Sequence, residues 1–136
     1  MLAELGIGVT AYGVLSRGLL AGSAPSGPGD FRGHFPRFTP QNLARNRQVV
    51  ATLAALGAEK GVSSSQLAIA WVLAKSETIV PVMGARTPAQ LAESLAALPI
   101  VLSPAELTRI EAAIPASAVA GDRYAPPQMQ MLDSER

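Results

Sequence analysis

Two arginines, each placed after a short β-branched segment, are the clearest chemical feature of this 136-residue chain. The stretch 6–22 runs such a segment into a turn that carries Arg17, and the stretch 78–98 does the same with Arg86 at the start of a capped helix. A guanidinium offers fixed hydrogen-bond donors and a helix N-terminus offers unpaired N–H groups, so each unit suits an anion. Two such units in one chain suggest a dinucleotide.

The composition narrows the class of protein. Apolar residues make up 49% of the chain, charged residues make up 15%, and the net charge is +1, which does not fit the basic stripe of a nucleic-acid-binding protein. The longest apolar run, 67–74, is far shorter than the roughly 20 residues of a membrane span. The chain has no cysteine and begins without an export signal, so we expect a cytoplasmic protein without disulfides.

The elements that would position the two arginines can be located from sequence patterns. Capping boxes begin at Ser63, Thr87 and Ser103, and β-branched runs at 7–12 and 78–83 predict strands. The predicted order is strand, helix, helix, strand, helix, helix, which indicates a parallel α/β arrangement. The predicted helices cover about 41–60, 64–74, 87–98 and 104–114.

Two segments fall outside these elements. The long loop 22–40 is rich in glycine and proline, but it also holds every phenylalanine of the chain, at positions 31, 35 and 38. Disordered linkers avoid aromatic residues, so we expect this loop to pack on the rest of the molecule. The segment 116–136 is polar and turn-rich, which predicts a docked or frayed C-terminal tail.

Only two strands can be found, and this number is too small for a stable parallel sheet. Parallel strands need helices on their faces and neighbours on their edges, and a helix that is apolar all round, as at 67–74, must be covered on more than one face. We therefore expect residues 1–136 to form a single partial domain, a piece of a larger sheet.

Each candidate site residue also has an ordinary interpretation. Tyr12 ends the first strand, so it is either a core tyrosine or an aromatic plate beneath a planar ring, because ligands bind at the carboxyl ends of parallel strands. Arg17 is either a solvated residue or a phosphate clamp. Gln90 has a sufficient role in the capping box, and Glu93 fits a solvated helix face. His34 is the only histidine, and no metal site or catalytic triad is predicted.

Five stretches of the chain together resemble a known family. They are "GIGVTAYGVLSRGLLAG", "DFRGHFPRF", "SSSQLAIAWVLA", "IVPVMGARTPAQLAESLAAL" and "GDRYAPP". In this order they resemble the C-terminal part of an aldo-keto reductase, of the perakine-reductase-like and potassium-channel β-subunit-like branch. The resemblance implies an α/β fold that is the C-terminal portion of a (β/α)8 TIM barrel. The chain would supply strands 7 and 8, their helices and two accessory helices, an incomplete barrel.

The resemblance also implies that this barrel binds NADP(H) in extended form without a Rossmann unit. Tyr12 matches the position that stacks on the nicotinamide ring. The turn that wraps the pyrophosphate would consist of Gly13, Leu15 and Arg17. Gly13 stands where the family has a serine, which removes one hydroxyl from that turn.

The second arginine unit would hold the adenosine end of the cofactor. By the same resemblance, the 2′-phosphate and ribose are bound by Gly84, Ala85 and Arg86. Gln90 and Glu93 would complete the adenine side.

The family's catalytic tetrad of aspartate, tyrosine, lysine and histidine lies in the first half of the barrel, so no catalytic residue is expected here. Tyr12 and Tyr124 sit in other motifs and inherit no such role. We expect the cofactor-binding part of an oxidoreductase that reduces small aldehydes or ketones, with the N-terminal barrel half as its partner. One alternative is a non-catalytic remnant that binds a nicotinamide nucleotide or a partner through open sheet edges. A self-contained small α/β domain is another.

Overall fold

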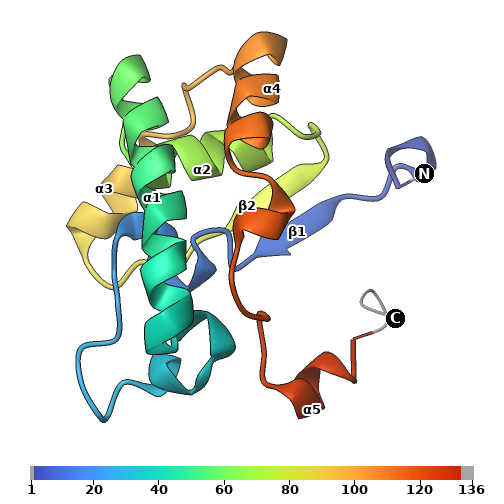
Figure 1. Ribbon diagram of the computed structural model, residues 1–136. Helices are drawn as coiled ribbons and strands as arrows, with labels where there is room; N and C mark the ends of the chain where they lie inside the picture. The colour runs from blue at the N-terminus through green and yellow to red at the C-terminus, as the bar shows by residue number, and fades with distance from the viewer. Residues whose placement is uncertain (1, 133–136) are drawn as a thin grey trace.

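The computed structural model of the protein describes residues 2–132 (Figure 1). The order of its main elements is the predicted one, with several short 3-10 helices and one further helical turn in the C-terminal segment. The strands and helices are β1 (Val9–Tyr12), α1 (Pro40–Lys60), α2 (Ser64–Leu73), β2 (Ile79–Val82), α3 (Pro88–Leu95), α4 (Pro104–Ala113) and α5 (Pro126–Met129). The 3-10 helices are η1 (Ala3–Leu5), η2 (Ser16–Ala21), η3 (Phe31–His34), η4 (Pro36–Phe38) and η5 (Ala116–Ala118).

Strands β1 and β2 form a two-stranded parallel sheet. Val9 pairs with Ile79 at one end and Tyr12 pairs with Val82 at the other. The carboxyl ends of both strands therefore lie side by side, at one edge of the sheet. β2 ends one residue after Pro81, as expected from a residue that cannot donate to a ladder. The confirmed parallel pairing brings the segments that follow the two strands to one side of the molecule.

The helix starts follow the capping signals with one exception. The boxes at Ser63 and Ser103 are complete, with both reciprocal hydrogen bonds formed. At Thr87 the hydroxyl accepts from the Gln90 N–H, but the Gln90 side chain accepts from the N–H of Arg86 instead of that of Thr87. The predicted capping box is therefore half formed there, because the Gln90 amide reaches one residue further back.

The hydrophobic core lies between α1, α2 and α4, and α2 separates α1 from β2 (Figure 1). As predicted for a helix that is apolar all round, α2 is covered on more than one side. Trp71 packs at the margin of this core, half-buried, and its indole N–H donates to Glu111 at 3.2 Å. The buried cluster consists of Leu53, Leu67, Ala68, Ala70, Leu102 and Ile110.

Two apolar surfaces stay largely exposed among the described residues. On the face of the sheet turned away from α2, Tyr12 is 68% exposed, Val80 59% and Val82 52%. The helix predicted over 87–98 ends at Leu95, so α3 carries Leu91 and Leu95 of the predicted stripe and Leu98 lies in the turn that follows. All three leucines are at least half exposed. The apolar pattern fixes which faces are hydrophobic, and the described residues leave at least half of each of these side chains exposed.

The long loop 22–40 packs against the helices, as predicted. Phe38 is buried, and Phe35 packs edge-on against Phe31 and Tyr124. The loop also contains an Asp30–Arg32 ion pair. His34 lies exposed in η3, in agreement with a solvated histidine.

The described part of the tail is docked through a buried asparagine of α1. The Asn46 amide donates to the Ala120 carbonyl at 2.9 Å and to the Arg37 carbonyl at 3.0 Å, and its oxygen accepts from the Ala120 N–H at 2.8 Å. One side chain thus joins α1, the loop and the tail. Residues 133–136 of the predicted tail lie outside the described residues.

Candidate functional site

The turn after β1 has an unusual backbone. Gly13 adopts a φ of 69°, which glycine tolerates without strain, but Ser16 and Arg17 also have positive φ values of 48° and 55°. Non-glycine residues in this region are held against a cost of roughly 1–3 kcal/mol each, and such residues concentrate at functional sites. The strained turn is therefore the first structural sign of a site at this edge.

The guanidinium of Arg17 lies over the Phe35 ring and near the Tyr124 ring. Its central carbon lies 3.8 Å from the centroid of the Phe35 ring and 5.1 Å from that of Tyr124, and Nη1 donates to the carbonyl of Arg123 at 3.1 Å. Stacking uses the flat faces of a guanidinium and leaves its edge donors to hydrogen bonds. Arg17 is accordingly half-buried and oriented, rather than a freely solvated side chain.

Tyr12 lies on the open face of the sheet beside this turn. Its hydroxyl is 3.0 Å from the hydroxyl of Tyr124, and this hydrogen bond raises the pKa of Tyr12, against the opposing charge of Arg123. Tyr12 is therefore not a core residue of the described chain. Its proposed role as a plate for a planar ring stays a prediction.

Leu15 has a structural role in the described chain. It is half-buried and packs against the core cluster, and it precedes the 3-10 helix η2. Any contact with a ligand would come from its backbone or from the turn that it anchors.

The second arginine unit lies on the exposed surface before α3. Gly84, Ala85 and Arg86 are all exposed, and the Arg86 N–H donates to the Gln90 side chain at 2.8 Å. The Gln90 N–H in turn donates to Thr87. The capping interaction thus orders the segment that carries Arg86, which lies one residue before the N-cap of α3.

Glu93 is tied to the start of α2. Its carboxylate accepts hydrogen bonds from the Ser63 hydroxyl and, at 3.1 Å, from the Gln66 amide. In the same helix turn, the Ser64 hydroxyl donates to the Leu20 carbonyl of η2 at 2.8 Å. The two arginine units are therefore anchored to the same end of α2, although the adenine-side role of Glu93 stays a prediction.

Sequence reasoning placed the first unit correctly next to β1 but missed the side chains that surround Arg17. Tyr124, Phe35 and Arg32 come from the tail and the long loop. The concentration of phenylalanines in 22–40 was the available signal for the loop. For Tyr124, the only signal was the "GDRYAPP" stretch.

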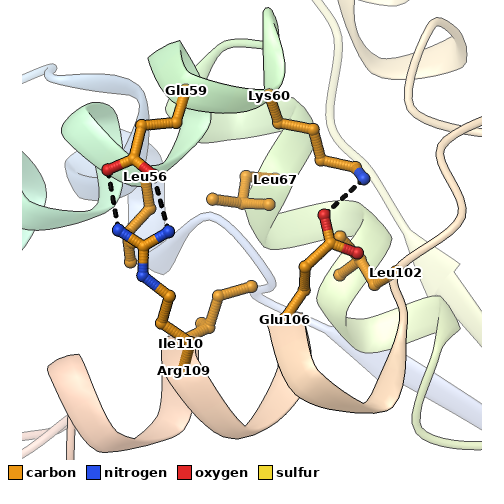
Figure 2. Close-up of a pocket in the computed structure, with 8 residues that line it drawn as sticks. All are labelled: Leu56, Glu59, Lys60, Leu67, Leu102, Glu106, Arg109 and Ile110. Carbon is orange, nitrogen blue, oxygen red and sulfur yellow. Dashed lines mark hydrogen bonds and ion pairs between the residues drawn. The ribbon is translucent and has the colours of Figure 1, made fainter.

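A hollow of about 190 Å³ lies elsewhere, between the end of α1 and α4 (Figure 2). Two ion pairs cross it, Arg109 with Glu59 and Lys60 with Glu106, each at 2.6 Å. Its charged groups thus satisfy one another, and it includes no residue from either strand end. Within residues 2–132, no group of three or more His, Asp or Glu side chains is placed to hold a metal ion.

The geometry defines an α/β protein with two anion-suited turns at the carboxyl edge of a parallel sheet. Residues 1–115 match the model of the aldo/keto reductase family, and the chain belongs to this family of oxidoreductases. It is similar to the probable aldo-keto reductase 1 of Glycine max, with 35% identity over 126 residues, which are 89% of this chain and 36% of that protein.

A solved structure supports the same assignment. The glycerol dehydrogenase of Gluconobacter oxydans matches with a TM-score of 0.73 and 25% identity, over 82% of this chain and 35% of that one. The α/β fold of this chain is thus similar to a portion of an aldo-keto reductase barrel. The chain spans about a third of the length of these relatives. In the part of the chain that the structure describes, no helix has the length and hydropathy to cross a bilayer.

Proposed function

We propose that the chain is the C-terminal, cofactor-holding part of an NADPH-dependent aldo-keto reductase that reduces small aldehydes or ketones to alcohols. The observation that carries the proposal is the register of the sheet. Tyr12 pairs with Val82, so the turn of Arg17 and the segment of Arg86 both begin at the carboxyl ends of the two strands, on the same side of the sheet. Ligand sites of parallel α/β folds lie at that edge.

The residues present fit an anionic dinucleotide. Arg17 is held so that its edge donors can bind a phosphate, and Arg86 adds a second cation at the N-terminus of α3, where the helix dipole favours an anion. Tyr12 offers an exposed ring beside the first cation. When bound, the nicotinamide would supply the hydride, and these residues would hold and orient the nucleotide.

The catalytic proton donor is proposed to lie outside this chain, in the first half of the barrel. A complete barrel of this kind has about 250 residues. Two largely exposed apolar surfaces are of the kind that further barrel strands and helices would bury. They are the sheet face at Tyr12, Val80 and Val82 and the leucines of α3. Together they support the N-terminal barrel half as the partner of this chain.

The binding claim can be tested by calorimetric titration of the chain with NADPH and with NADH. A charge-assisted hydrogen bond contributes about 1.5–3 kcal/mol, so Arg86→Ala should weaken NADPH binding roughly 10- to 150-fold. It should also remove the preference for NADPH over NADH, because Arg86 is proposed to bind the 2′-phosphate. Arg47→Ala, at an exposed position of α1, is the matched control. Equal binding of both nucleotides by the unchanged chain would contradict the assignment.

The catalytic claim has its own test. The chain alone should not reduce a carbonyl substrate, and measurable NADPH-dependent turnover would show that a proton donor lies within it. The open edges and the exposed face of the sheet also favour the second candidate, an interaction module without catalysis. A chain that binds the nucleotide, and that gains no activity with an N-terminal barrel half, would support this second function.

A further inference from the structure

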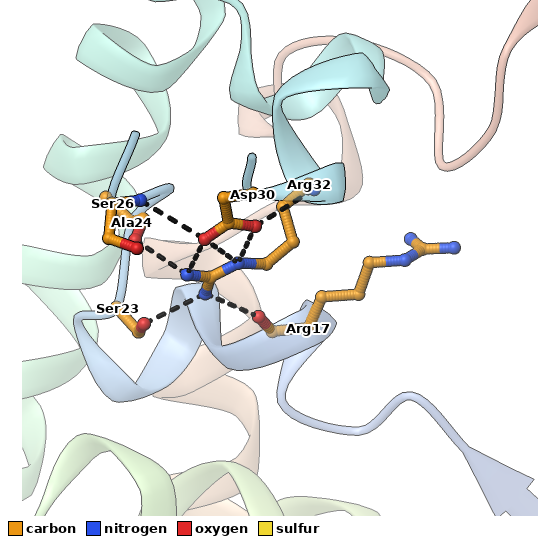
Figure 3. Close-up of polar contacts among 6 residues, drawn as sticks. All are labelled: Arg17, Ser23, Ala24, Ser26, Asp30 and Arg32. Carbon is orange, nitrogen blue, oxygen red and sulfur yellow. Dashed lines mark hydrogen bonds and ion pairs between the residues drawn. The ribbon is translucent and has the colours of Figure 1, made fainter. Parts of the chain in front are cut away.

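Side chains of the loop 22–40 hydrogen-bond to the strained turn at Arg17. Arg32 Nη1 donates to the Arg17 carbonyl at 3.2 Å and to the Ser23 hydroxyl at 2.9 Å (Figure 3). Arg32 Nη2 donates to the Ala24 carbonyl at 2.8 Å. One guanidinium therefore joins the backbone of the turn to two later positions of the chain, and the Arg17 side chain extends away from this cluster.

Asp30 fixes the orientation of Arg32. Its carboxylate accepts from Arg32 Nε at 2.9 Å and from Nη2 at 2.6 Å, and it also accepts from the Arg32 N–H and the Ser26 N–H. Both side chains are largely buried, with 17% of Arg32 and 13% of Asp30 exposed. The hydrogen bonds from Arg32 hold the pKa of Asp30 well below its usual range, so this pair stays ionised in the physiological range.

The same loop contacts the turn at two further points. Arg37 Nη1 donates to the Ser16 hydroxyl at 3.3 Å, and the Phe35 ring lies against the Arg17 guanidinium. Both non-glycine residues with positive φ are thus held by the loop, one through its hydroxyl and the other through its carbonyl. Such conformations persist only where the surroundings determine them.

We propose that Arg32, oriented by Asp30, is a positioning residue that holds the Arg17 peptide in its left-handed conformation and so sets the affinity of the site for the pyrophosphate of a dinucleotide. The inference rests on the proposed function. Without the hydrogen bond to the Arg17 carbonyl, the turn is free to relax to negative φ, and the Arg17 side chain leaves its position. A preorganised site binds more tightly because its ordering cost is met before the ligand arrives.

The substitution Arg32→Lys separates geometry from charge. Lysine keeps the positive charge, but it lacks the planar fork that reaches a carboxylate, a hydroxyl and two carbonyls at once. The probes are NADPH, which spans both arginine units, and adenosine 2′-phosphate, which is expected to engage only the Arg86 unit. Both are titrated calorimetrically against the unchanged chain, Arg32→Lys, Asp30→Asn and, as a control on the exposed side of α1, Arg47→Lys.

We expect Arg32→Lys to weaken NADPH binding about 10-fold and to leave the binding of adenosine 2′-phosphate unchanged, with Asp30→Asn in between and Arg47→Lys without effect. An equal loss for both probes, accompanied by a lower melting temperature, would show a merely structural role and overturn the inference. Unchanged NADPH binding in Arg32→Lys would overturn it while leaving the proposed function intact. An unchanged chain that binds neither probe would overturn both.

Discussion

The hydroxyl oxygens of Tyr12 and Tyr124 lie 3.0 Å apart, and this hydrogen bond joins the end of β1 to the C-terminal segment. Tyr124 also packs against Phe35 and lies near the guanidinium of Arg17. The tail therefore contributes directly to the edge where the site is proposed. A residue far along the chain thus sets the surroundings of both Tyr12 and Arg17.

The first prediction concerns this pair. Tyr124→Phe keeps the ring but removes the hydroxyl, so the pKa of Tyr12 should fall toward its ordinary value of about 10. The chain has two tyrosines, so NMR titration with ring-labelled tyrosine can follow each one. In the variant, Tyr12 is the tyrosine that remains, so its signal is assigned directly. Arg123, whose charge lowers the pKa of Tyr12, stays in place in this variant. A Tyr12 pKa that does not move would show that the hydroxyls do not interact in solution.

The second prediction concerns Asn46, which is 1% exposed. Asn46→Ala removes three hydrogen bonds and leaves the N–H and carbonyl of Ala120 without this partner in a buried place. Unsatisfied buried groups cost about 1–3 kcal/mol each, so we expect the free energy of unfolding to fall by about 2–4 kcal/mol. Urea unfolding measures this change in the free energy of unfolding. Gln48→Ala, exposed on the same helix, should change it by less than about 0.5 kcal/mol, and similar values for both variants would contradict the role of Asn46.

Asn46 also shows what the sequence could not predict. Local patterns revealed the strands, the helix starts and the apolar stripes, because propensity, capping and periodicity act within a few residues. A single asparagine in a helix carries no sign that two distant segments will use its amide. The contacts of Arg17 with Phe35 and Tyr124 were missed for the same reason. The pattern locates Leu91 and Leu95 on α3 but extends the helix to Leu98 instead of Leu95, and a periodic pattern cannot say what covers such a stripe.

The third prediction compares Gly121, which is closely packed, with Gly33, which has open space where a Cβ would lie. Gly121 has a φ of 80°, and a Cβ there would lie 2.7 Å from the Asn42 amide nitrogen and 2.8 Å from the Pro36 carbonyl carbon. Gly121→Ala should therefore lower the free energy of unfolding by about 2–4 kcal/mol, from overpacking and from the left-handed backbone. In Gly33→Ala the new Cβ meets nothing within 4 Å. Thermal or urea unfolding should show little change for that control, and equal effects would refute the close packing at Gly121.

The fourth prediction concerns acid stability. The hydrogen bond from Lys60 (Figure 2), and then those from the backbone and side chain of Ser103, lower the pKa of Glu106 to about 2. A carboxylate whose pKa is lower in the folded state stabilises that state above its unfolded pKa of about 4.3. This contribution is lost as the pH falls from there through about 2. Glu106→Gln should therefore be less stable than the unchanged chain at neutral pH, and the difference should shrink across that acid window.

Glutamine suits this test because it can still accept from the Ser103 N–H in the capping box, so the variant removes mainly the charge. Urea unfolding at a series of pH values gives the difference in free energy directly. Glu77→Gln, at an exposed position between α2 and β2, is the control for loss of one carboxylate. Added salt should narrow the neutral-pH difference, because the Lys60–Glu106 pair is partly exposed and open to screening. A difference between Glu106→Gln and the unchanged chain that is constant from neutral to acid pH would rule out the ion pair as its source.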